Sequence, residues 1–316
     1  MKKTGVLVVG SANMDLVVKA TRFPRPGETL FGNGFGMFPG GKGANQAVAC
    51  AKLGARTILI AKIGNDIFGD RLADSMKHDG VCLDHVLCDP AEPTGIALIT
   101  VDGGGENKIL VVPGSNMKLT PGEIDTLLTH FAGTRTVLLQ LEIPLATVTR
   151  TAVLARAAGA TVILNPAPAC RLSRSLLGLV DYLTPNEHEA ELLSGLPVHS
   201  VKSGEKAARR LLRMGVKNVI LTLGERGALL VTAESAKPFP AVKVKAVDTT
   251  AAGDAFNGAL AFALSTDARI DEAIRFANAV GAMAVTQPGA QSSLPTMRGV
   301  RTFLRKRRLP LLPGLR

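Results

Sequence analysis

The sequence predicts an α/β protein in which a Rossmann-like parallel sheet is covered by helices on both faces. Two observations predict this class: short, continuously apolar runs recur along the chain, and amphipathic stretches of helical length separate them. A strand that is covered on both faces is apolar throughout, and a crossover between parallel strands has room for a helix. The expected strands are 6–10, 57–61, 136–141, 161–165, 181–185 and 218–223.

The amphipathic stretches predict the helices between these strands. They are 43–53, 66–79, 121–131, 145–158, 187–194, 203–214, 253–264 and 271–285. A further strand is expected in the alternating run FPAVKVKAV, which ends at Val247. The chain shows no fixed-period repeat, and we expect residues 1–316 to form a single domain.

Two segments interrupt the alternation and predict a small additional sheet. Segment 14–38 includes the glycine-rich, extended run ETLFGNGFGMF, and segment 94–114 has the pattern of a hairpin around DGGGEN. Such inserted antiparallel pieces would form a structural flap, a dimer contact or a lid, and we expect a β lid. The alternating apolar residues Ile96, Leu98 and Val101 would leave one face of the lid uncovered, so we expect two lids to pair in a homodimer.

The composition is that of a folded globular protein, and it disfavours several functions. Hydrophobic residues make up 46% of the chain and charged residues 20%, which is enough to bury a core. The chain has no Trp, and Tyr182 is its only Tyr, which disfavours the aromatic platforms that bind single-stranded nucleic acid. No apolar run reaches the length of a membrane span, and the apolar part of MKKTGVLVVG is too short for a signal peptide. We therefore expect neither a nucleic acid nor a membrane as a partner.

Two segments carry much of the net charge of +11, namely 201–217 and 303–316. We expect the first to be a solvated helix face and the second a basic C-terminal tail that is solvated or disordered. The positive field would favour small anions such as nucleoside phosphates. The cysteines at positions 50, 82, 88 and 170 lack the spacing of metal or redox sites, which is typical of reduced thiols in a cytoplasmic protein.

Polar residues follow the expected strands at their carboxyl ends. They are Asn13, Asp15, Glu142, Asn165, Asn186 and Thr222. In an open parallel sheet, ligands bind in the crevice at this edge. Each residue alone fits ordinary turn chemistry, but their recurrence along one edge predicts a ligand site.

The stretch VDTTAAGDAF, 247–256, is predicted to be a loop that enters a helix N-terminus. Ala251, Ala252 and Gly253 have almost no side chain, so their amides stay open to a ligand, and the helix dipole favours negative charge there. Asp254 alone would fit a helix cap. Beside an anion-binding loop, however, it suits a reaction in which negative charge builds on one group while a hydroxyl loses its proton. Phosphoryl transfer to an alcohol has both requirements.

A second glycine-rich stretch, FPGGKGANQAVACAKLG, spans residues 38–54. Gly36, Gly41 and Lys42 have the spacing of a phosphate-binding P-loop, but Gly43 replaces the magnesium-binding Ser or Thr and no buried strand precedes it. The P-loop interpretation is therefore rejected. A plain helix-entry loop and a glycine turn that lets backbone approach a ligand both remain possible here.

Together, GGKGAN at 40–45 and DTTAAGDAF at 248–256 resemble the two signatures of the PfkB-type carbohydrate kinases. The resemblance extends from VVGSANMD to AVTQPGAQSSLP, over essentially the whole chain. The stretches SANMD, PGGKGANQA, LNPAPA and PNEHEAE are most similar to family members that phosphorylate ribose. Ala251 stands where glycine is commoner in the wider family, and this departure is usual in the ribose-phosphorylating subgroup.

The resemblance implies an ATP-dependent transfer of the γ-phosphoryl group to the 5-hydroxyl of D-ribose, with ATP and ribose as partners. Asp254 would be the base, and the amides of Ala251, Ala252 and Gly253 would form the anion hole. The sugar would be held by Asn13, Asp15, Gly41, Lys42, Asn45, Glu142 and Asp254. These side chains offer the paired donors and acceptors that a neutral polyol needs. The single Lys among them disfavours a substrate that already carries a phosphate.

The resemblance also implies nucleotide and cation sites. Nucleotide contacts would come from Asn186, Thr222, Gly224, Gly227, Gly253 and Asn278. Glu189, in the family's NxxE motif, would act indirectly on the Mg²⁺ that accompanies ATP. An activating K⁺ would lie at Asp248, Thr250, Ala284, Gln287, Gly289 and Ser293, several of them through backbone carbonyls.

Three alternatives are weighed against this interpretation. A sibling kinase could act on deoxyribose, another free sugar or a nucleoside. A Rossmann dehydrogenase is disfavoured because no GxGxxG follows the first expected strand. A non-catalytic sugar or nucleic-acid binder on the same fold is disfavoured by the intact Asp254 and by the lack of an aromatic and basic patch.

Overall fold

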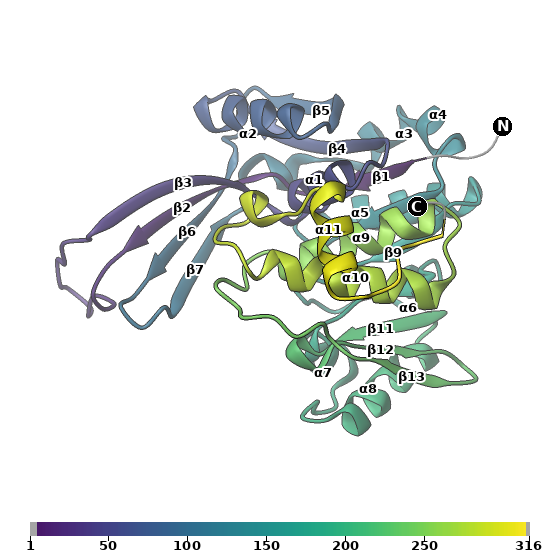
Figure 1. Cartoon of the computed structure of the whole chain (residues 1–316). Helices are drawn as coiled ribbons and strands as arrows, with labels where there is room; N and C mark the ends of the chain where they lie inside the picture. Colours follow the sequence, from purple (N-terminus) through teal and green to yellow (C-terminus); the bar gives the residue numbers. More distant parts are fainter. Residues whose placement is uncertain (1–4, 314–316) are drawn as a thin grey trace.

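The computed structural model describes residues 5–313 and contains a nine-stranded and a four-stranded sheet (Figure 1). The larger sheet has the order β13 (Ala236–Phe239), β12 (Ala228–Val231), β11 (Asn218–Thr222), β10 (Tyr182–Leu183), β9 (Thr161–Leu164), β8 (Thr136–Leu139), β1 (Val6–Val9), β4 (Thr57–Gly64) and β5 (Cys82–Asp89). All neighbouring strands from β11 to β5 are parallel, and the two pairs β11–β12 and β12–β13 are antiparallel. The predicted α/β fold class is confirmed.

Helices fill most of the connections between the strands of the large sheet, and three more follow its last strand. They are α1 (Lys42–Lys52), α2 (Ile67–His78), α3 (Pro121–Asp125), α4 (Leu128–Ala132), α5 (Leu145–Ala157), α6 (Arg174–Leu177), α7 (Glu187–Ser194), α8 (Val201–Arg213), α9 (Ala252–Ser265), α10 (Ile270–Ala284) and α11 (Met297–Lys306). Short 3-10 helices occur at η1 (Gly114–Lys118), η2 (Gly224–Arg226) and η3 (Gln291–Ser293). No helix of the described part is long and apolar enough to cross a membrane.

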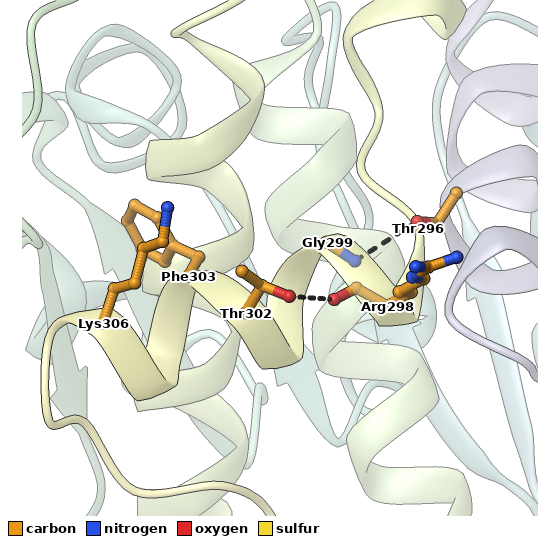
Figure 2. Close-up of a pocket in the computed structure, with 6 residues that line it drawn as sticks. All are labelled: Thr296, Arg298, Gly299, Thr302, Phe303 and Lys306. Atoms are coloured by element: carbon orange, nitrogen blue, oxygen red, sulfur yellow. Dashed lines mark hydrogen bonds between the residues drawn. The ribbon is translucent and has the colours of Figure 1, made fainter.

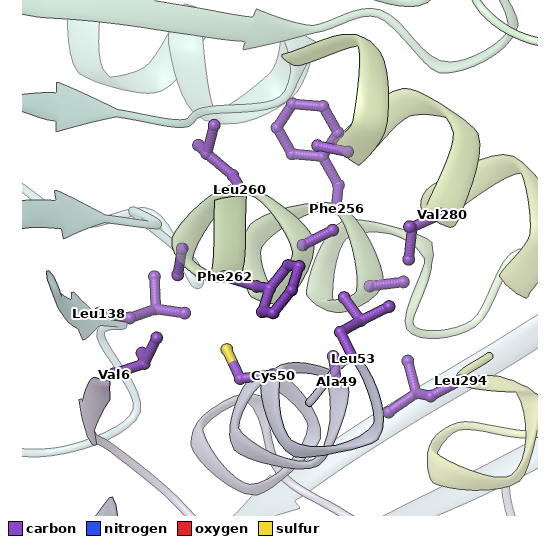
Figure 3. Close-up of a cluster of buried hydrophobic side chains, with 14 of the residues drawn as sticks. Val6, Ala49, Cys50, Leu53, Leu138, Phe256, Leu260, Phe262, Val280 and Leu294 are labelled. Carbon is purple, nitrogen blue, oxygen red and sulfur yellow. The ribbon is translucent and has the colours of Figure 1, made fainter. Parts of the chain in front are cut away.

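The two faces of the large sheet bury separate cores because successive side chains of a strand point to opposite faces. In β1, Val6 and Val8 join the cluster formed with α1, α2, α9, α10 and α11, whereas Leu7 and Val9 join the cluster formed with α3 to α8. Figure 3 shows the first cluster, to which Phe256, Leu260 and Phe262 of α9 contribute together with Cys50 of α1 and Leu53, the residue after that helix. Both faces of each central strand are therefore buried, which explains their continuously apolar sequences.

The smaller sheet extends away from the main body at the left of Figure 1 and has the order β3 (Gly34–Gly40), β2 (Asn13–Lys19), β6 (Gly95–Val101) and β7 (Asn107–Val112). β2 pairs with β3 in antiparallel and with β6 in parallel fashion, and β6 and β7 form the hairpin expected around DGGGEN. Large apolar side chains are exposed here, including Phe35 at 66% and Leu110 at 64%. Ile96 and Leu98 share one face as expected, but Val101 lies on the other because an odd separation changes the face of a strand.

Several elements differ from the sequence prediction. The strands β5, β12 and β13 were not expected, and residues 240–246 form no strand although their apolar residues alternate. The expected helix 121–131 is divided into α3 and α4. β5 was missed because an edge strand is only half buried and its residues, CLDHVLCD, mix polar and apolar types.

The C-terminal segment also differs from the solvated or disordered tail expected for 303–316. Helix α11 continues to Lys306, and Leu304 and Leu312, each 2% exposed, belong to the core of the main body. The apolar residues between the basic ones therefore anchor the described part of this segment. The start of MKKTGVLVVG and the last three residues of the tail lie outside the described residues.

Candidate active site

The site begins where the order of the large sheet reverses. β1 lies between β8 and β4, so the segments that leave β1 and β8 run in different directions and leave a crevice at their carboxyl ends. Ser11, just after β1, donates from Oγ to Oε2 of Glu142, just after β8, at 2.5 Å. The same carboxylate oxygen accepts the backbone N–H of Lys42 at 3.0 Å. Two polar strand ends and the start of α1 thus meet at one point.

Helix α1 can begin in the crevice because one glycine directly precedes the helix and another lies in its first turn. Gly41 has a φ of 86°, and a Cβ there would lie 2.6 Å from the backbone nitrogen of Asn13. A Cβ at Gly43 would lie 2.5 Å from the nitrogen of Ser11. The backbone of this turn therefore lies close to the segment that carries Asn13, and its approach to a ligand stays a prediction.

Helix α9 carries Asp254 in its first turn, and this side chain contacts the start of α1. Asp254 is 8% exposed. Its Oδ2 accepts from Asn45 Nδ2 and its Oδ1 from Gln46 Nε2, each at 2.9 Å. Because both donors belong to α1, Asp254 does not act as a simple cap of its own helix. The carboxylate is held at the interface between the two helices, with one amide on each oxygen.

The predicted sugar residues gather around the ammonium group of Lys42. Burial lowers the pKa of Lys42, but the carboxylates of Asp254, Glu142, Glu189 and Asp15 outweigh burial and hold the pKa above its ordinary value. Burial, followed by the charges of Glu142 and Asp254, raises the pKa of Asp15 to about 7. The cluster is therefore a dense arrangement of acceptors around one cation.

Burial also raises the pKa of Asp254, and Lys42 and the amides of Asn45 and Gln46 offset part of this effect. A carboxylate with a raised pKa is a stronger base when it is ionised. Asp254 thus has the burial, the fixed orientation and the basicity that removal of a hydroxyl proton requires.

Two buried polar atoms at the site, Asn45 Oδ1 and Gln140 Oε1, lack a partner within the described residues, and the first lies beside Asp254. Asn45 Oδ1 accepts no hydrogen bond, although its Nδ2 donates to Asp254. A buried polar group is almost always satisfied, so an unpartnered acceptor beside Asp254 fits a ligand that donates a hydroxyl hydrogen. Sugar hydroxyls are such donors.

The loop before α9 provides free amides for an anion. Ala251 is in the left-handed region with a φ of 58° and immediately precedes the helix. Among the described residues, the N–H groups of Ala251, Gly253 and Asp254 find no acceptor, whereas that of Ala252 donates to the Thr249 carbonyl at 3.2 Å. A Cβ at Gly253 would meet no atom within 4 Å, so the space beside this amide is open. Two of the three amides expected in the anion hole are free, and the amide of Asp254 is a third free donor.

The predicted nucleotide residues lie further along the same edge. Asn186 caps α7 in a capping box, donating from its backbone N–H to Glu189 Oε2 at 2.9 Å and accepting the Glu189 N–H at 2.8 Å. Burial raises the pKa of Glu189. Glu189 therefore caps the N-terminus of α7 together with Asn186, and its negative charge also helps to raise the pKa of Lys42.

Two glycines and Thr222 define the other part of the predicted nucleotide region. Thr222 donates its backbone N–H to the carbonyl of Pro185 at 2.9 Å, which joins β11 to the segment before α7. Gly224 has a φ of 55° with open space around it, and a Cβ at Gly227 would meet the Phe239 carbonyl at 2.1 Å. Asn278 donates to the carbonyls of Phe239 and Pro240 at 3.1 and 3.3 Å, so its amide nitrogen holds this turn.

Two loops meet at the predicted K⁺ position. Asp248 accepts the Thr250 N–H on Oδ1 and the Gly289 N–H on Oδ2, each at 2.9 Å. Partial burial raises the pKa of Asp248, but these hydrogen bonds outweigh it and hold the pKa below its ordinary value. Ala284 and Ser293 are buried nearby in the chain, whereas Gln287 is exposed. Carboxylate and carbonyl oxygens fit a hard monovalent cation, and no cluster of three His, Cys, Asp or Glu side chains that could hold another metal occurs in residues 5–313.

Several residues of the site were not predicted from the sequence. They are Ser11, Gln46, Asn116 and Gln140. Asn165 was expected at this edge of the sheet, but its contact with Gln46 was not. Gln140 Nε2 donates to Gln46 Oε1 at 2.5 Å, and Gln46 Nε2 also donates to Asn165 Oδ1 at 3.0 Å. Ser11 and Gln46 lie inside the stretches SANMD and PGGKGANQA, and this proximity was the only sequence signal. Asn116 had none.

A separate hollow on the outer side of α11 shares no residue with this site. It is lined by Thr296, Arg298, Gly299, Thr302, Phe303 and Lys306 (Figure 2). The hydrogen bonds drawn there join residues of α11 and its cap to one another, including Thr302 to the Arg298 carbonyl at 3.1 Å. The carboxylate cluster at the start of α1 and α9 is thus the site where polar groups converge.

The fold agrees with comparisons to known proteins. The model of the pfkB family of carbohydrate kinases matches residues 3–297, and the chain belongs to this family of ATP-dependent phosphotransferases. It is similar to the ribokinase of Haemophilus influenzae, with 41% identity over 96% of this chain and 99% of the relative. It is also similar to the deoxyribokinase of Salmonella typhi, with 38% identity over 95% of this chain and 98% of the relative. Among solved structures, the ribokinase of Arabidopsis thaliana complexed with ribose and ATP superimposes with a TM-score of 0.89, at 34% identity, covering 96% and 99% of the two chains.

Proposed function

We propose that the protein is a ribokinase that transfers the γ-phosphoryl group of ATP to the 5-hydroxyl of D-ribose. The observation that carries the proposal is the buried carboxylate of Asp254, which α1 holds through Asn45 and Gln46 beside the free amides that open α9. A base and an anion site next to each other are what this reaction needs.

The proposed reaction has two parts, a proton transfer to the protein and a phosphoryl transfer from ATP to the sugar. Asp254 accepts the proton of the ribose 5-hydroxyl, and the oxygen of that hydroxyl forms a bond to the γ-phosphorus. The bond from the γ-phosphorus to the oxygen that bridges it to the β-phosphate breaks, and ADP leaves with the electron pair. The amides of Ala251, Gly253 and Asp254 donate to the oxygens of the transferring group, where negative charge is concentrated.

The acceptor is proposed to be a neutral sugar. Lys42 is surrounded by carboxylates, so its charge is already balanced and does not favour a substrate that carries a phosphate. Asp15, Glu142 and Asn45 offer acceptors for sugar hydroxyls, and Asn13 offers an amide. The likeness to relatives named ribokinase supports ribose as the sugar.

Two cations complete the proposal. Mg²⁺ would enter with ATP and neutralise charge on its phosphates, with Glu189 acting on it indirectly. K⁺ would be held by oxygens of the two loops that Asp248 connects. Its binding would stabilise the loop that leads into α9. The residues present offer oxygen atoms, which are the ligands that both Mg²⁺ and K⁺ prefer.

A deoxyribokinase is the second candidate, because the Salmonella typhi deoxyribokinase is nearly as similar to this chain as the ribokinase is. The test is a panel of ribose, 2-deoxyribose, other free sugars and nucleosides, assayed for ATP-dependent phosphorylation. The matched control is Asp254→Asn, which keeps the shape of the side chain and should lower kcat by about 10²–10⁴-fold. The highest kcat/KM with ribose supports the proposal, the highest value with 2-deoxyribose replaces it with the second candidate, and no phosphorylation of any acceptor overturns both.

A further inference from the structure

We propose that Asn116 is a positioning residue for the sugar site, which fixes the Asn13 side chain as a hydrogen-bond donor and ties it to the base of the small sheet. The inference rests on the proposed function, because it assumes that Asn13 contacts the sugar. Asn116 lies in η1, immediately after the last strand of the small sheet, and is 1% exposed. It is 103 positions from Asn13 in the sequence.

The orientation of the Asn116 amide is determined by backbone groups. Its Oδ1 accepts the N–H of Ala12 at 2.9 Å, and a backbone N–H can only donate. Its Nδ2 donates to the carbonyls of Ala12 and Pro113 at 3.1 and 2.9 Å, and a carbonyl can only accept. A rotation of the amide by 180° would place like groups against each other at every one of these contacts.

The orientation of Asn116 in turn decides that of Asn13. Asn116 Nδ2 donates to Asn13 Oδ1 at 2.7 Å in a buried contact. Because the oxygen of Asn13 must face this donor, its Nδ2 points the other way, and within the described chain this nitrogen makes no hydrogen bond. Asn13 therefore presents a donor. Asp15, two residues further along β2 and on the same face, presents an acceptor.

A donor and an acceptor in this order suit neighbouring hydroxyls of a sugar. One hydroxyl oxygen can accept from Asn13 while a hydroxyl hydrogen is donated to Asp15. If the Asn13 amide turned over, two acceptors would face the sugar and one hydrogen bond would be lost. Asn116 thus determines that Asn13 donates a hydrogen bond to the sugar, although Asn116 does not itself contact the sugar.

The same pair of amides joins the strands of the small sheet at their base. Asn13 is the first residue of β2, and Pro113 directly follows β7. A Cβ on Gly95, at the start of β6, would lie 2.2 Å from Asn13 Oδ1 and 2.3 Å from Asn116 Nδ2. Gly95 leaves the room that the amide pair fills. A movement of the small sheet about its base would therefore act directly on the Asn13 side chain.

A double-mutant cycle of Asn13→Ala and Asn116→Ala tests the inference, with the acceptor that the wild type uses best. We expect Asn13→Ala and Asn116→Ala each to raise the KM for the sugar by about tenfold, the usual value of one lost hydrogen bond, with little change in the KM for ATP. The double variant should be no worse than Asn13→Ala alone, because Asn116 acts through Asn13. Independent, multiplying effects would overturn the inference.

Isosteric variants provide a second measurement if the truncation at position 116 does not fold. Asn13→Asp keeps an acceptor toward Asn116 and places a second acceptor toward the sugar. Asn116→Asp should draw the Asn13 amide nitrogen toward itself and so also turn an acceptor to the sugar. The two changes should raise the KM for the sugar by similar factors. A normal sugar KM in Asn116→Asp would contradict the proposal.

The control is Ser115→Ala, the neighbouring buried residue of η1, whose Oγ donates to the Lys62 carbonyl at 3.0 Å and which contacts no sugar residue. It should lower the melting temperature without changing the sugar KM. If the wild type phosphorylates no acceptor, the proposed function fails, and amide hydrogen exchange still decides the present inference. Exchange at Ala12 should be faster in Asn116→Ala than in Ser115→Ala, and equal rates would overturn the positioning role.

Discussion

Gln46 and Asp254 are separated by 208 positions in the sequence, yet Gln46 Nε2 donates to Asp254 Oδ1 at 2.9 Å. The contact is possible because α1 and α9 pack closely at Gly258, where a Cβ would lie 2.5 Å from the Ala49 Cβ and 2.9 Å from the Gln46 carbonyl oxygen. Two adjacent amides of α1 therefore hold the two oxygens of one carboxylate.

Replacing Gln46 with Ala should change the pH dependence of catalysis. The Gln46 amide helps to lower the pKa of Asp254, against the larger effect of burial. Without it the pKa rises, the base becomes protonated at higher pH, and the acidic limb of the kcat/KM profile should move toward alkaline pH. We also expect about a tenfold lower rate at neutral pH, because one hydrogen bond to a charged group is lost.

The matched control for Gln46→Ala is Cys50→Ala, one turn further along α1 and equally buried. Cys50 donates to the Gly258 carbonyl at 3.2 Å and has no contact with Asp254. Its variant should keep the wild-type pH profile. If the two variants shifted the profile alike, helix packing and not the amide contact would be responsible.

Asp15→Asn should stabilise the free protein at alkaline pH. The pKa of Asp15 is about 7 in the folded protein and 3.8 ordinarily, so between these values the folded state holds a proton that the unfolded chain releases. The stability of the wild type therefore falls as the pH rises through this window. The variant escapes a loss of up to about 4 kcal/mol, at 1.4 kcal/mol per pKa unit.

Melting temperatures of Asp15→Asn and the wild type at pH 5 and pH 8 measure this effect. The advantage of the variant should be larger at pH 8, and its affinity for the sugar should be lower. Asp74→Asn, an exposed position on α2, should show no such pH dependence. An advantage that is independent of pH would contradict the raised pKa.

Ala251→Gly should increase the free energy of unfolding by about 1 kcal/mol, because Ala251 has a φ of 58° and glycine adopts this conformation without steric cost. The backbone amide that we assign to the anion site is kept, so kcat should change little. Arg308, with a φ of 55° at an exposed position, offers the matched substitution far from the site. Arg308→Gly should stabilise by a similar amount, and destabilisation by Ala251→Gly would show that the side chain makes contacts that outweigh the strain.

Potassium should activate the enzyme. Replacing sodium with potassium at constant ionic strength should raise kcat/KM, because carbonyl and carboxylate oxygens favour the larger, more weakly hydrated ion. Asp248→Ala removes the side chain that joins Thr250 to Gly289 and should abolish the difference between the two salts. Equal rates of the wild type in both salts would exclude a functional cation site.

The small sheet should close over the sugar and pair with a second copy. Leu16, Leu98 and Leu110 are direct cross-strand neighbours and share one face, and the last two are 43% and 64% exposed. Leu110→Lys should convert a dimer to a monomer in a mass measurement in solution, whereas Lys108→Leu, two residues away in the same strand, should not. Amide exchange in β6 and β7 should slow when ribose binds, and a monomeric wild type or unchanged exchange would contradict the dimer or the lid respectively.

The amino-acid sequence alone determined the class of fold and the main parts of the site. Buried parallel strands must be apolar on both faces, so each central strand appears as a local run, and helix periodicity locates most of the helices between them. Asp254, Lys42 and Asn45 could be predicted because helix entries rich in small residues have a local pattern. These signals come from chemistry within a few residues.

Only the tertiary structure decided which distant groups meet. The amide pair of Asn116 and Asn13, the contact of Gln46 with Asp254 and the bond of Ser11 to Glu142 each join residues that are 103 or more positions apart. A buried amide has the same local sequence whether it holds a backbone turn or the carboxylate of a distant helix, so no local pattern distinguishes the two. The edge strand β5 and the packing of Leu312 depend in the same way on what covers them, because burial is a property of the folded chain and not of the residue.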